Sequence, residues 1–214
     1  PWPERPWAGM PGMLRGARRR KAGDLGAQNA QYLAEVGVRA NGKLIAEMGA
    51  QLNYVPQWYY YFGGLADKIQ GAFIPLDKKG YFNFTRYEPL GVVVAITPWN
   101  SPLMLTAWKL APALAAGNTV VIKPSEFTSA SALEFVKLVE QAGFPAGVGN
   151  VVTGYGKEAG RPLVEQPLTD KIPFTGSDET GRGIGETAGG GLQREGQERG
   201  GKNDTRRARA GGVG

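Results

Sequence analysis

The chain has 214 residues, enough for one ordinary domain or one and a half, and its 42% hydrophobic residues suffice for a core. It contains no cysteine and no histidine, which excludes disulfides, zinc-finger spacings, Cys-His and Ser-His-Asp catalysis, and haem held by histidine. The net charge of +6 lies at the two ends, because residues 1–22 carry +5 and residues 191–214 carry +3, which leaves −2 for the residues between them.

The charge distribution bears on possible partners. The basic run at residues 18–21 stands among Pro, Gly and Trp without aromatic interleaving, so we interpret it as solvated and expect no nucleic-acid partner. No window approaches the roughly 18 to 20 apolar residues that cross a bilayer, and the N-terminus has no apolar signal core. We therefore expect a cytoplasmic protein that does not enter a membrane.

The first part of the chain is predicted to be helical after a loose start. Residues 1–23 are expected to form a disordered basic segment, since their first half is rich in Pro and Gly. Residues 24–70 show apolar residues at helical spacing in two pieces. Pro56 is expected to kink or divide the second piece, because proline lacks an N–H and clashes with the preceding turn.

Residues 71–89 read as an antiparallel hairpin. Phe82 and Phe84 alternate with polar residues, and the DKKG sequence at 77–80 supplies turn chemistry. Either this domain or a second subunit must cover the resulting aromatic face. Packing into the protein's own core is an equally good interpretation.

Residues 90–190 alternate between strand and helix patterns. Four strand-helix units with continuously apolar strands, the first being GVVVAIT at residues 91–97, predict an α/β fold with a Rossmann-like, doubly wound parallel sheet. The apolar signal ends near residue 189. A fifth strand is therefore poorly supported, the sheet is expected to be incomplete, and residues 191–214 are expected to form a disordered Gly/Arg-rich tail.

Ligands of such sheets bind beyond the carboxyl ends of the strands. That rule directs attention to four segments of this chain: residues 97–101, 123–126, 153–157 and 175–181. The first strand-helix turn lacks the G-x-G-x-x-G sequence that usually cradles a diphosphate.

Each candidate residue has a functional and a purely structural interpretation. Gly176 and Ser177 stand where a helix N-terminus favours an anion, but Ser177 is also a good N-cap. Lys123 and Glu126 stand where dinucleotide-binding folds hold a ribose, or they form a surface pair. Asn100, between two prolines, is able to donate its amide N–H to an oxyanion or to form an Asx turn.

Four motifs in order resemble the NAD(P)-dependent aldehyde dehydrogenase superfamily. They are ITPWN at 96–100, AWKLAPALAAGNTVVIKPSE at 107–126, AGFPAGVGNVVTG at 142–154 and FTGSDETGR at 174–182. The similarity extends upstream to YFGGLADKIQG at 61–71, which resembles the helix before that family's oligomerisation hairpin. We therefore expect an N-terminal fragment of such an enzyme, with an oligomerisation hairpin at residues 71–89.

The resemblance implies a role for individual residues. Asn100 matches the oxyanion-hole asparagine, and Glu198 falls where the family has its general base. NAD is the implied cofactor because Glu126 suits a ribose diol, whereas Lys123 could tolerate the 2′-phosphate of NADP. The implied cofactor-binding residues are Ile96, Thr97, Pro98, Trp99, Lys123, Glu126, Gly156, Gly176 and Ser177. No metal site is implied.

The chain also departs from the family pattern. The family nucleophile is a cysteine, and this chain has none. Nothing after Lys202 resembles the family, and we interpret that tail as a frame error or artificial join. The family implies an aldehyde substrate, oxidised to a carboxylic acid, and a homo-oligomer. We expect no turnover from this chain; the alternative is a module that retains dinucleotide binding or subunit pairing without catalysis.

Overall fold

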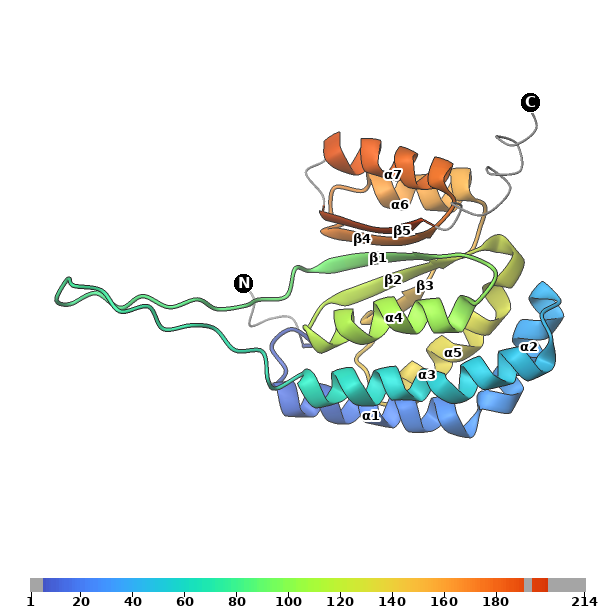
Figure 1. Ribbon diagram of the computed structural model, residues 1–214, viewed down its shortest axis with the longest axis horizontal. Helices are drawn as coiled ribbons and strands as arrows, with labels where there is room; N and C mark the ends of the chain where they lie inside the picture. Colours follow the sequence, from blue (N-terminus) through green and yellow to red (C-terminus); the bar gives the residue numbers. More distant parts are fainter. Residues whose placement is uncertain (1–5, 191–193, 200–214) are drawn as a thin grey trace, which may run out of the picture.

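The computed structural model describes residues 6–190 and 194–199 (Figure 1). Its centre is a parallel five-stranded sheet with the strand order β3-β2-β1-β4-β5. The strands are β1 Val92–Thr97, β2 Thr119–Pro124, β3 Gly149–Val151, β4 Lys171–Gly176 and β5 Arg194–Arg199. The predicted α/β fold class, with a Rossmann-like doubly wound sheet preceded by helices, is confirmed.

Four helices connect the strands and cover both faces of the sheet. They are α4 Pro102–Ala115, α5 Ser129–Gln141, α6 Arg161–Glu165 and α7 Asp178–Gly190. Figure 1 shows α4 and α5 on one face and α6 and α7 on the other. Because helices cover both faces, the middle of the central strand is apolar on both sides: Val93, Val94 and Ala95 of β1 are all at most 2% exposed.

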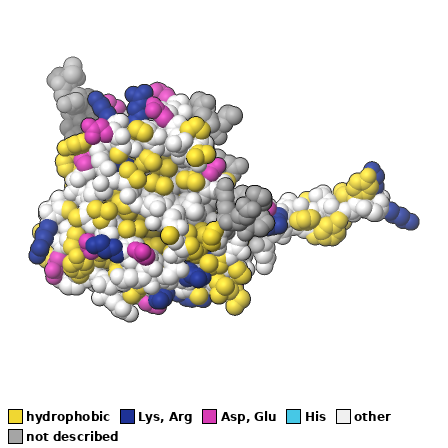
Figure 2. Space-filling view, turned by 180° about the vertical axis from the view of Figure 1, so that it is seen from behind, with side chains coloured by type: hydrophobic (Ala, Val, Ile, Leu, Met, Phe, Trp, Pro, Cys, Tyr) yellow, Lys and Arg dark blue, Asp and Glu magenta, His cyan; other side chains and the backbone are white. Residues whose placement is uncertain are grey.

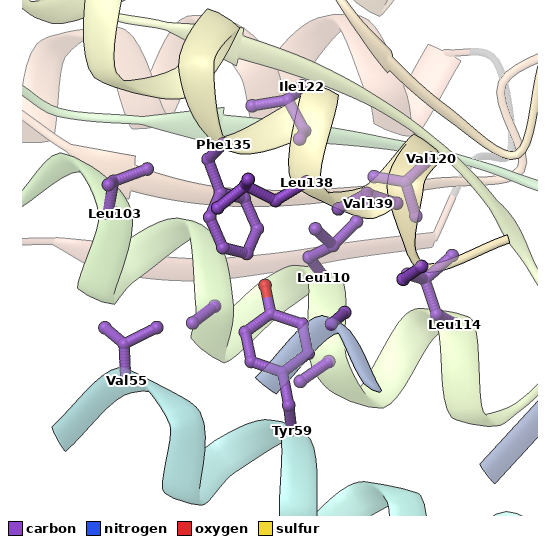
Figure 3. Packing of buried hydrophobic residues seen from close by; sticks show 14 of the residues in the cluster. Val55, Tyr59, Leu103, Leu110, Leu114, Val120, Ile122, Phe135, Leu138 and Val139 are labelled. Carbon is purple, nitrogen blue, oxygen red and sulfur yellow. The ribbon is translucent and has the colours of Figure 1, made fainter. Parts of the chain in front are cut away.

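Three N-terminal helices thicken one side of the molecule. They are α1 Gly12–Gln28, α2 Ala30–Asn41 and α3 Ile45–Leu65, and they pack against α4 and α5 (Figure 1). Figure 3 shows Tyr59 of α3 pointing toward Leu110 and Phe135 of this joint core. The rings of Tyr59 and Phe135 lie 5.6 Å apart, and burial raises the pKa of the Tyr59 hydroxyl.

The start of the first helix differs from the sequence prediction. Residues 12–23 belong to α1, so the expected disordered segment over residues 1–23 is wrong for this part. The reason is close packing rather than a hydrophobic stripe: a Cβ at Gly16 would lie 2.5 Å from the carbonyl oxygen of Gly63 in α3. Arg19, predicted to be solvated, is fully buried there, and desolvation lowers its pKa to about 10.

Pro56 does not divide the second helical piece. Helix α3 runs from Ile45 to Leu65 with Pro56 inside it and buried. The packing of its neighbours Leu52, Val55 and Tyr59, each at most 2% exposed, offsets the hydrogen bond that proline removes. None of the described helices is both long and apolar enough to cross a bilayer.

The fifth strand is a second correction. Residues 194–199 pair with β4 in parallel, from Lys171↔Arg194 to Gly176↔Arg199, whereas the sequence indicated a tail without a strand. Backbone hydrogen bonds make this pairing, so it does not require the apolar side chains used for the prediction. The Gln197 side chain donates to the Gly181 carbonyl of α7 at 2.8 Å. The remainder of the predicted tail, residues 191–193 and 200–214, lies outside the described residues.

Residues 71–88 form a narrow arm that projects from the body (Figure 1). Phe73 and Phe84 form an antiparallel bridge, and the Ile74 N–H donates to the Asn83 carbonyl at 2.9 Å. Phe82 lies between the two bridge residues, with ring centroids 5.2 and 5.4 Å away. Figure 2 shows hydrophobic side chains gathered along the arm. Phe73, Phe82 and Phe84 are 56–74% exposed, so the described part of the chain does not bury them.

The layered core predicts that two leucine-to-alanine substitutions change the free energy of unfolding by very different amounts. We expect Leu110→Ala, at a fully buried position of α4, to lower the free energy of unfolding by about 2–5 kcal/mol, because it leaves a cavity. Leu168→Ala, at a position that is 73% exposed, is the matched control and should change it by less than about 0.5 kcal/mol. Urea titration followed by circular dichroism measures both. Equal losses would contradict the assigned core.

Candidate cofactor site at the carboxyl edge of the sheet

The turn after β1 brings five predicted residues to the edge of the sheet. Ile96 and Thr97 end the strand, and Pro98, Trp99 and Asn100 lead into α4. Trp99 is 55% exposed and Thr97 only 2%. The buried Thr97 hydroxyl has no hydrogen-bond partner among the described residues. A buried hydroxyl of this kind normally has a partner, so it fits a ligand-binding position.

Lys123 and Glu126 lie at the end of the neighbouring strand β2. The Lys123 Nζ lies 3.5 Å from Glu126 Oε2, with the lysine side chain 5% and the glutamate side chain 33% exposed. Glu126 begins the 3-10 turn Glu126–Thr128, where Ser125 Oγ accepts from the Phe127 N–H at 3.4 Å. The pair therefore presents a carboxylate to solvent over a mostly buried cation. Both the ribose site and the ion pair of the sequence analysis remain compatible with this arrangement.

Gly176 and Ser177 form the junction between β4 and α7. Ser177 Oγ accepts from the Thr180 N–H at 3.3 Å, and the Gly181 N–H donates to the Ser177 carbonyl at 3.0 Å. Ser177 thus caps α7, as its structural interpretation predicts. A capped helix start still presents N–H groups and the positive end of the helix dipole, which favour an anion. Asp178 and Glu179 in the first turn oppose an anion there and so limit this attraction.

One cavity of about 1030 Å³ unites these segments. All ten predicted residues from Ile96 to Ser177, including Gly156 in the π turn Gly156–Gly160, line it. Its volume is at the upper end of the range for small-molecule sites, as a dinucleotide requires. The eleventh predicted residue, Glu198, has its backbone in β5. Its side chain lies outside the described part of the structure.

Beyond Thr180, which lies in the predicted segment 175–181, sequence reasoning missed the far wall of this cavity. Thr180, Gly183, Ile184 and Thr187 line it from α7, and Val164 lines it from α6. The α7 residues recur at three- and four-residue intervals, which places them on one helix face, and this spacing is the signal that could have identified them. Lys109 of α4 was also missed: it is 7% exposed, and its ammonium donates to the hydroxyl of Thr175, a cavity residue.

The charged side chains around the cavity are of both signs. Lys123, Lys157 and Arg161 line it together with Glu126 and Glu186. A hydrogen bond of 2.6 Å to Glu165 raises the pKa of the Arg161 guanidinium. Among the described residues, His, Cys, Asp and Glu form no group of three that would hold a metal ion. The donors suit a phosphate-bearing organic ligand, since backbone N–H groups and cationic side chains occur together with the Glu126 carboxylate.

Comparisons with known proteins match this chain to aldehyde dehydrogenases. A sequence model described as the aldehyde dehydrogenase family matches residues 3–206. A (Z)-2-((N-methylformamido)methylene)-5-hydroxybutyrolactone dehydrogenase of Acinetobacter baylyi is 47% identical over 197 residues, which are 92% of this chain and 40% of that protein.

Solved structures give the same result. An NAD-dependent aldehyde dehydrogenase from Sinorhizobium meliloti superposes with a TM-score of 0.90 at 37% identity, covering 94% of this chain and 40% of the other. Betaine aldehyde dehydrogenase from Staphylococcus aureus, in complex with NAD+, superposes with a TM-score of 0.89 at 36% identity, covering 92% and 39%. The chain therefore spans about 40% of the length of the relatives it matches.

Proposed function

Because this chain belongs to the aldehyde dehydrogenase family, we propose that its carboxyl-edge cavity binds NAD. The observation that carries the proposal is the convergence of ten predicted residues from four segments on one cavity. The complex of the Staphylococcus aureus relative with NAD+ supports the choice of ligand. The proposal extends to the parent enzyme class, an oxidoreductase that converts an aldehyde to a carboxylic acid.

The proposed contacts follow the geometry of the cavity. Glu126 accepts hydrogen bonds from the adenosine ribose diol, with Lys123 beneath it, and Gly156 lies toward the adenine. Gly176 and Ser177, at the start of α7, hold the diphosphate. Ile96, Thr97, Pro98 and Trp99 form the wall on the nicotinamide side. NAD is preferred to NADP because the Glu126 carboxylate would repel a 2′-phosphate, an effect that Lys123 reduces.

The catalytic contribution of this chain is limited. Bound NAD would supply a hydride acceptor, Asn100 would donate its amide to the substrate oxygen, and Glu198 would act as general base. The family route through a thioester requires a cysteine thiolate, and these 214 residues contain none. We therefore propose dinucleotide binding without turnover for this chain on its own.

A second proposed function is subunit pairing through the arm. Phe73, Phe82 and Phe84 form a ring cluster that is more than half exposed on a segment projecting from the body (Figure 2). Exposed aromatic clusters of this kind mark interaction surfaces. The proposed partner is a second copy of this chain or of a full-length relative.

Loss of the ribose contact should weaken NAD binding. We expect Glu126→Ala to raise the NAD dissociation constant roughly tenfold, because a charge-assisted hydrogen bond contributes about 1.5–3 kcal/mol and part of it is screened where 33% of the side chain is exposed. Isothermal titration calorimetry measures this dissociation constant.

The matched control is Glu134→Ala, on α5. That glutamate accepts from Lys137 at 2.6 Å and does not line the cavity, so the dissociation constant should stay the same. An equal loss of affinity in both variants would show that the ribose contact is misassigned. If the folded parent chain does not bind NAD, the proposed function is wrong.

The missing nucleophile leads to a separate expectation. With NAD and a small aldehyde such as propanal, the purified chain should form no NADH above the rate without protein, measured by absorbance at the NADH band. Steady turnover that scales with chain concentration would contradict this expectation and require a nucleophile other than cysteine.

A further inference from the structure

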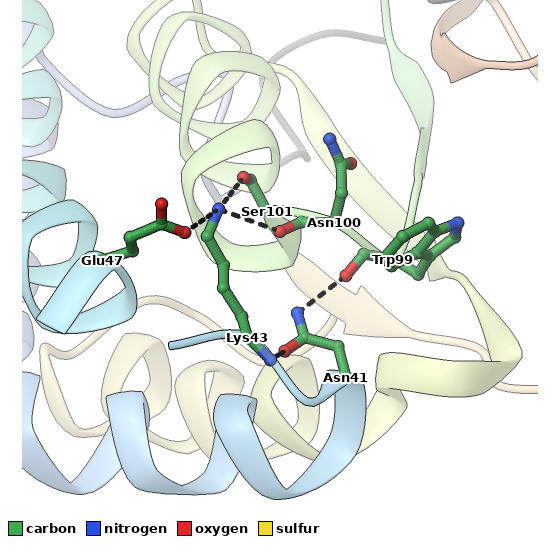
Figure 4. Close-up of polar contacts among 6 residues, drawn as sticks. All are labelled: Asn41, Lys43, Glu47, Trp99, Asn100 and Ser101. Atoms are coloured by element: carbon green, nitrogen blue, oxygen red, sulfur yellow. Dashed lines mark hydrogen bonds and ion pairs between the residues drawn. The ribbon is translucent and has the colours of Figure 1, made fainter. Parts of the chain in front are cut away.

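The turn that carries Asn100 is tied to a distant part of the chain. Asn41 ends α2, and Lys43 lies in the short loop between α2 and α3. Both reach residues 99–101, between β1 and α4 (Figure 4). We propose that Asn41 and Lys43 are positioning residues that fix the backbone of this turn and so direct the Asn100 side chain. The role of the Asn100 side chain rests on the proposed function; the fixing of the turn does not.

Three contacts make the connection. The Asn41 side-chain amide donates to the Trp99 carbonyl at 3.0 Å. The Lys43 ammonium lies 3.5 Å from the Asn100 carbonyl oxygen and 3.4 Å from Ser101 Oγ. Two consecutive carbonyl groups of the turn are therefore held from the same side, which fixes the orientation of both peptide planes.

The conformation of the α2–α3 loop orients the Asn41 and Lys43 side chains toward the turn. Gly42 caps the end of α2 with φ +71°, a left-handed conformation suited to glycine, and its N–H donates to the Val38 carbonyl at 2.8 Å. Asn41 Oδ1 accepts from the Lys43 N–H at 3.0 Å. The oxygen of the Asn41 amide therefore binds the loop, while its nitrogen binds the turn. Glu47, 3.8 Å from the Lys43 Nζ, adds a weak ion pair on the next helix turn.

The turn makes one backbone hydrogen bond at its end, where the Ser101 carbonyl accepts from the Leu105 N–H of α4 at 3.0 Å. Pro98 and Pro102 flank it and lack backbone N–H groups, and Ser101 makes no side-chain cap to α4. The Trp99 side chain is 55% exposed, so more than half of it is not held by packing. Figure 4 shows the Asn100 side chain pointing away from Lys43, on the side opposite the two tied carbonyls. Without these contacts to the two carbonyls, the peptide planes would be able to rotate. The Asn100 side-chain amide would then adopt a wider range of orientations.

The experiment measures order in the turn directly. In the 15N-labelled chain we expect backbone order parameters near 0.85 for the Trp99, Asn100 and Ser101 amides, falling below about 0.6 in Lys43→Ala and in Asn41→Ala. Lys43→Arg should restore most of the order, because it keeps a long cationic donor. The NAD dissociation constant should rise about three- to tenfold in the two alanine variants, since Trp99 and Asn100 line the cavity.

Lys137→Ala is the matched control, because that lysine pairs with Glu134 on α5 and does not line the cavity. It should leave the three order parameters unchanged. If Lys43→Ala does not fold by circular dichroism, Lys43→Gln replaces it, with the same expected fall. Unchanged order parameters in the folded Lys43 and Asn41 variants would overturn the proposal. If the parent chain binds no NAD, the proposed function fails, and the order parameters still decide this inference.

Discussion

The reversal of strand order at β1 is the constraint on which the rest of the structure depends. The chain runs from β1 outward to β2 and β3, then returns to pair β4 with the other side of β1. In register, Thr97 lies beside Pro124 and Ile96 beside Phe174. The ends of β1, β2 and β4 therefore meet at one edge, and the loops that follow them diverge to opposite faces. A crevice forms where they separate, and the candidate cofactor site occupies it.

The two faces of the sheet contribute differently to that edge. On one face, α4 and α5 pack with the three N-terminal helices into a large apolar core. That core fixes α2 and α3, and through them the loop that contacts the Asn100 turn. On the other face, α6 and α7 enclose a small cluster around Ile172 and Phe174, and its members Val164 and Ile184 belong to the far wall of the cavity. The site thus has a large apolar core behind one side and a small apolar cluster behind the other.

Local sequence signals account for the central strands and most of the site. Val93, Val94 and Ala95 are apolar because both faces of β1 are covered, and the candidate residues were located because they follow such strands. Strand β5 was missed because Arg194–Arg199 lacks that signal and is held by backbone pairing to β4. The start of α1 was missed because Gly16 meets α3 through close backbone approach, which leaves no hydrophobic periodicity. The contact of Asn41 with Trp99 spans 58 residues, so no local pattern reports it.

The position of the dinucleotide on the sheet tests the proposed cofactor site most directly. Titration of the 15N-labelled chain with NAD, followed by backbone amide chemical shifts, reports it residue by residue. We expect the largest shifts at the carboxyl edge, on Thr97, Trp99, Gly156 and Ser177. Gly91 and Asn118, which hydrogen-bond to each other at 3.0 Å on the opposite edge, should stay unchanged. Shifts centred on that opposite edge, or spread evenly over the chain, would contradict the assignment of the cavity as the cofactor site.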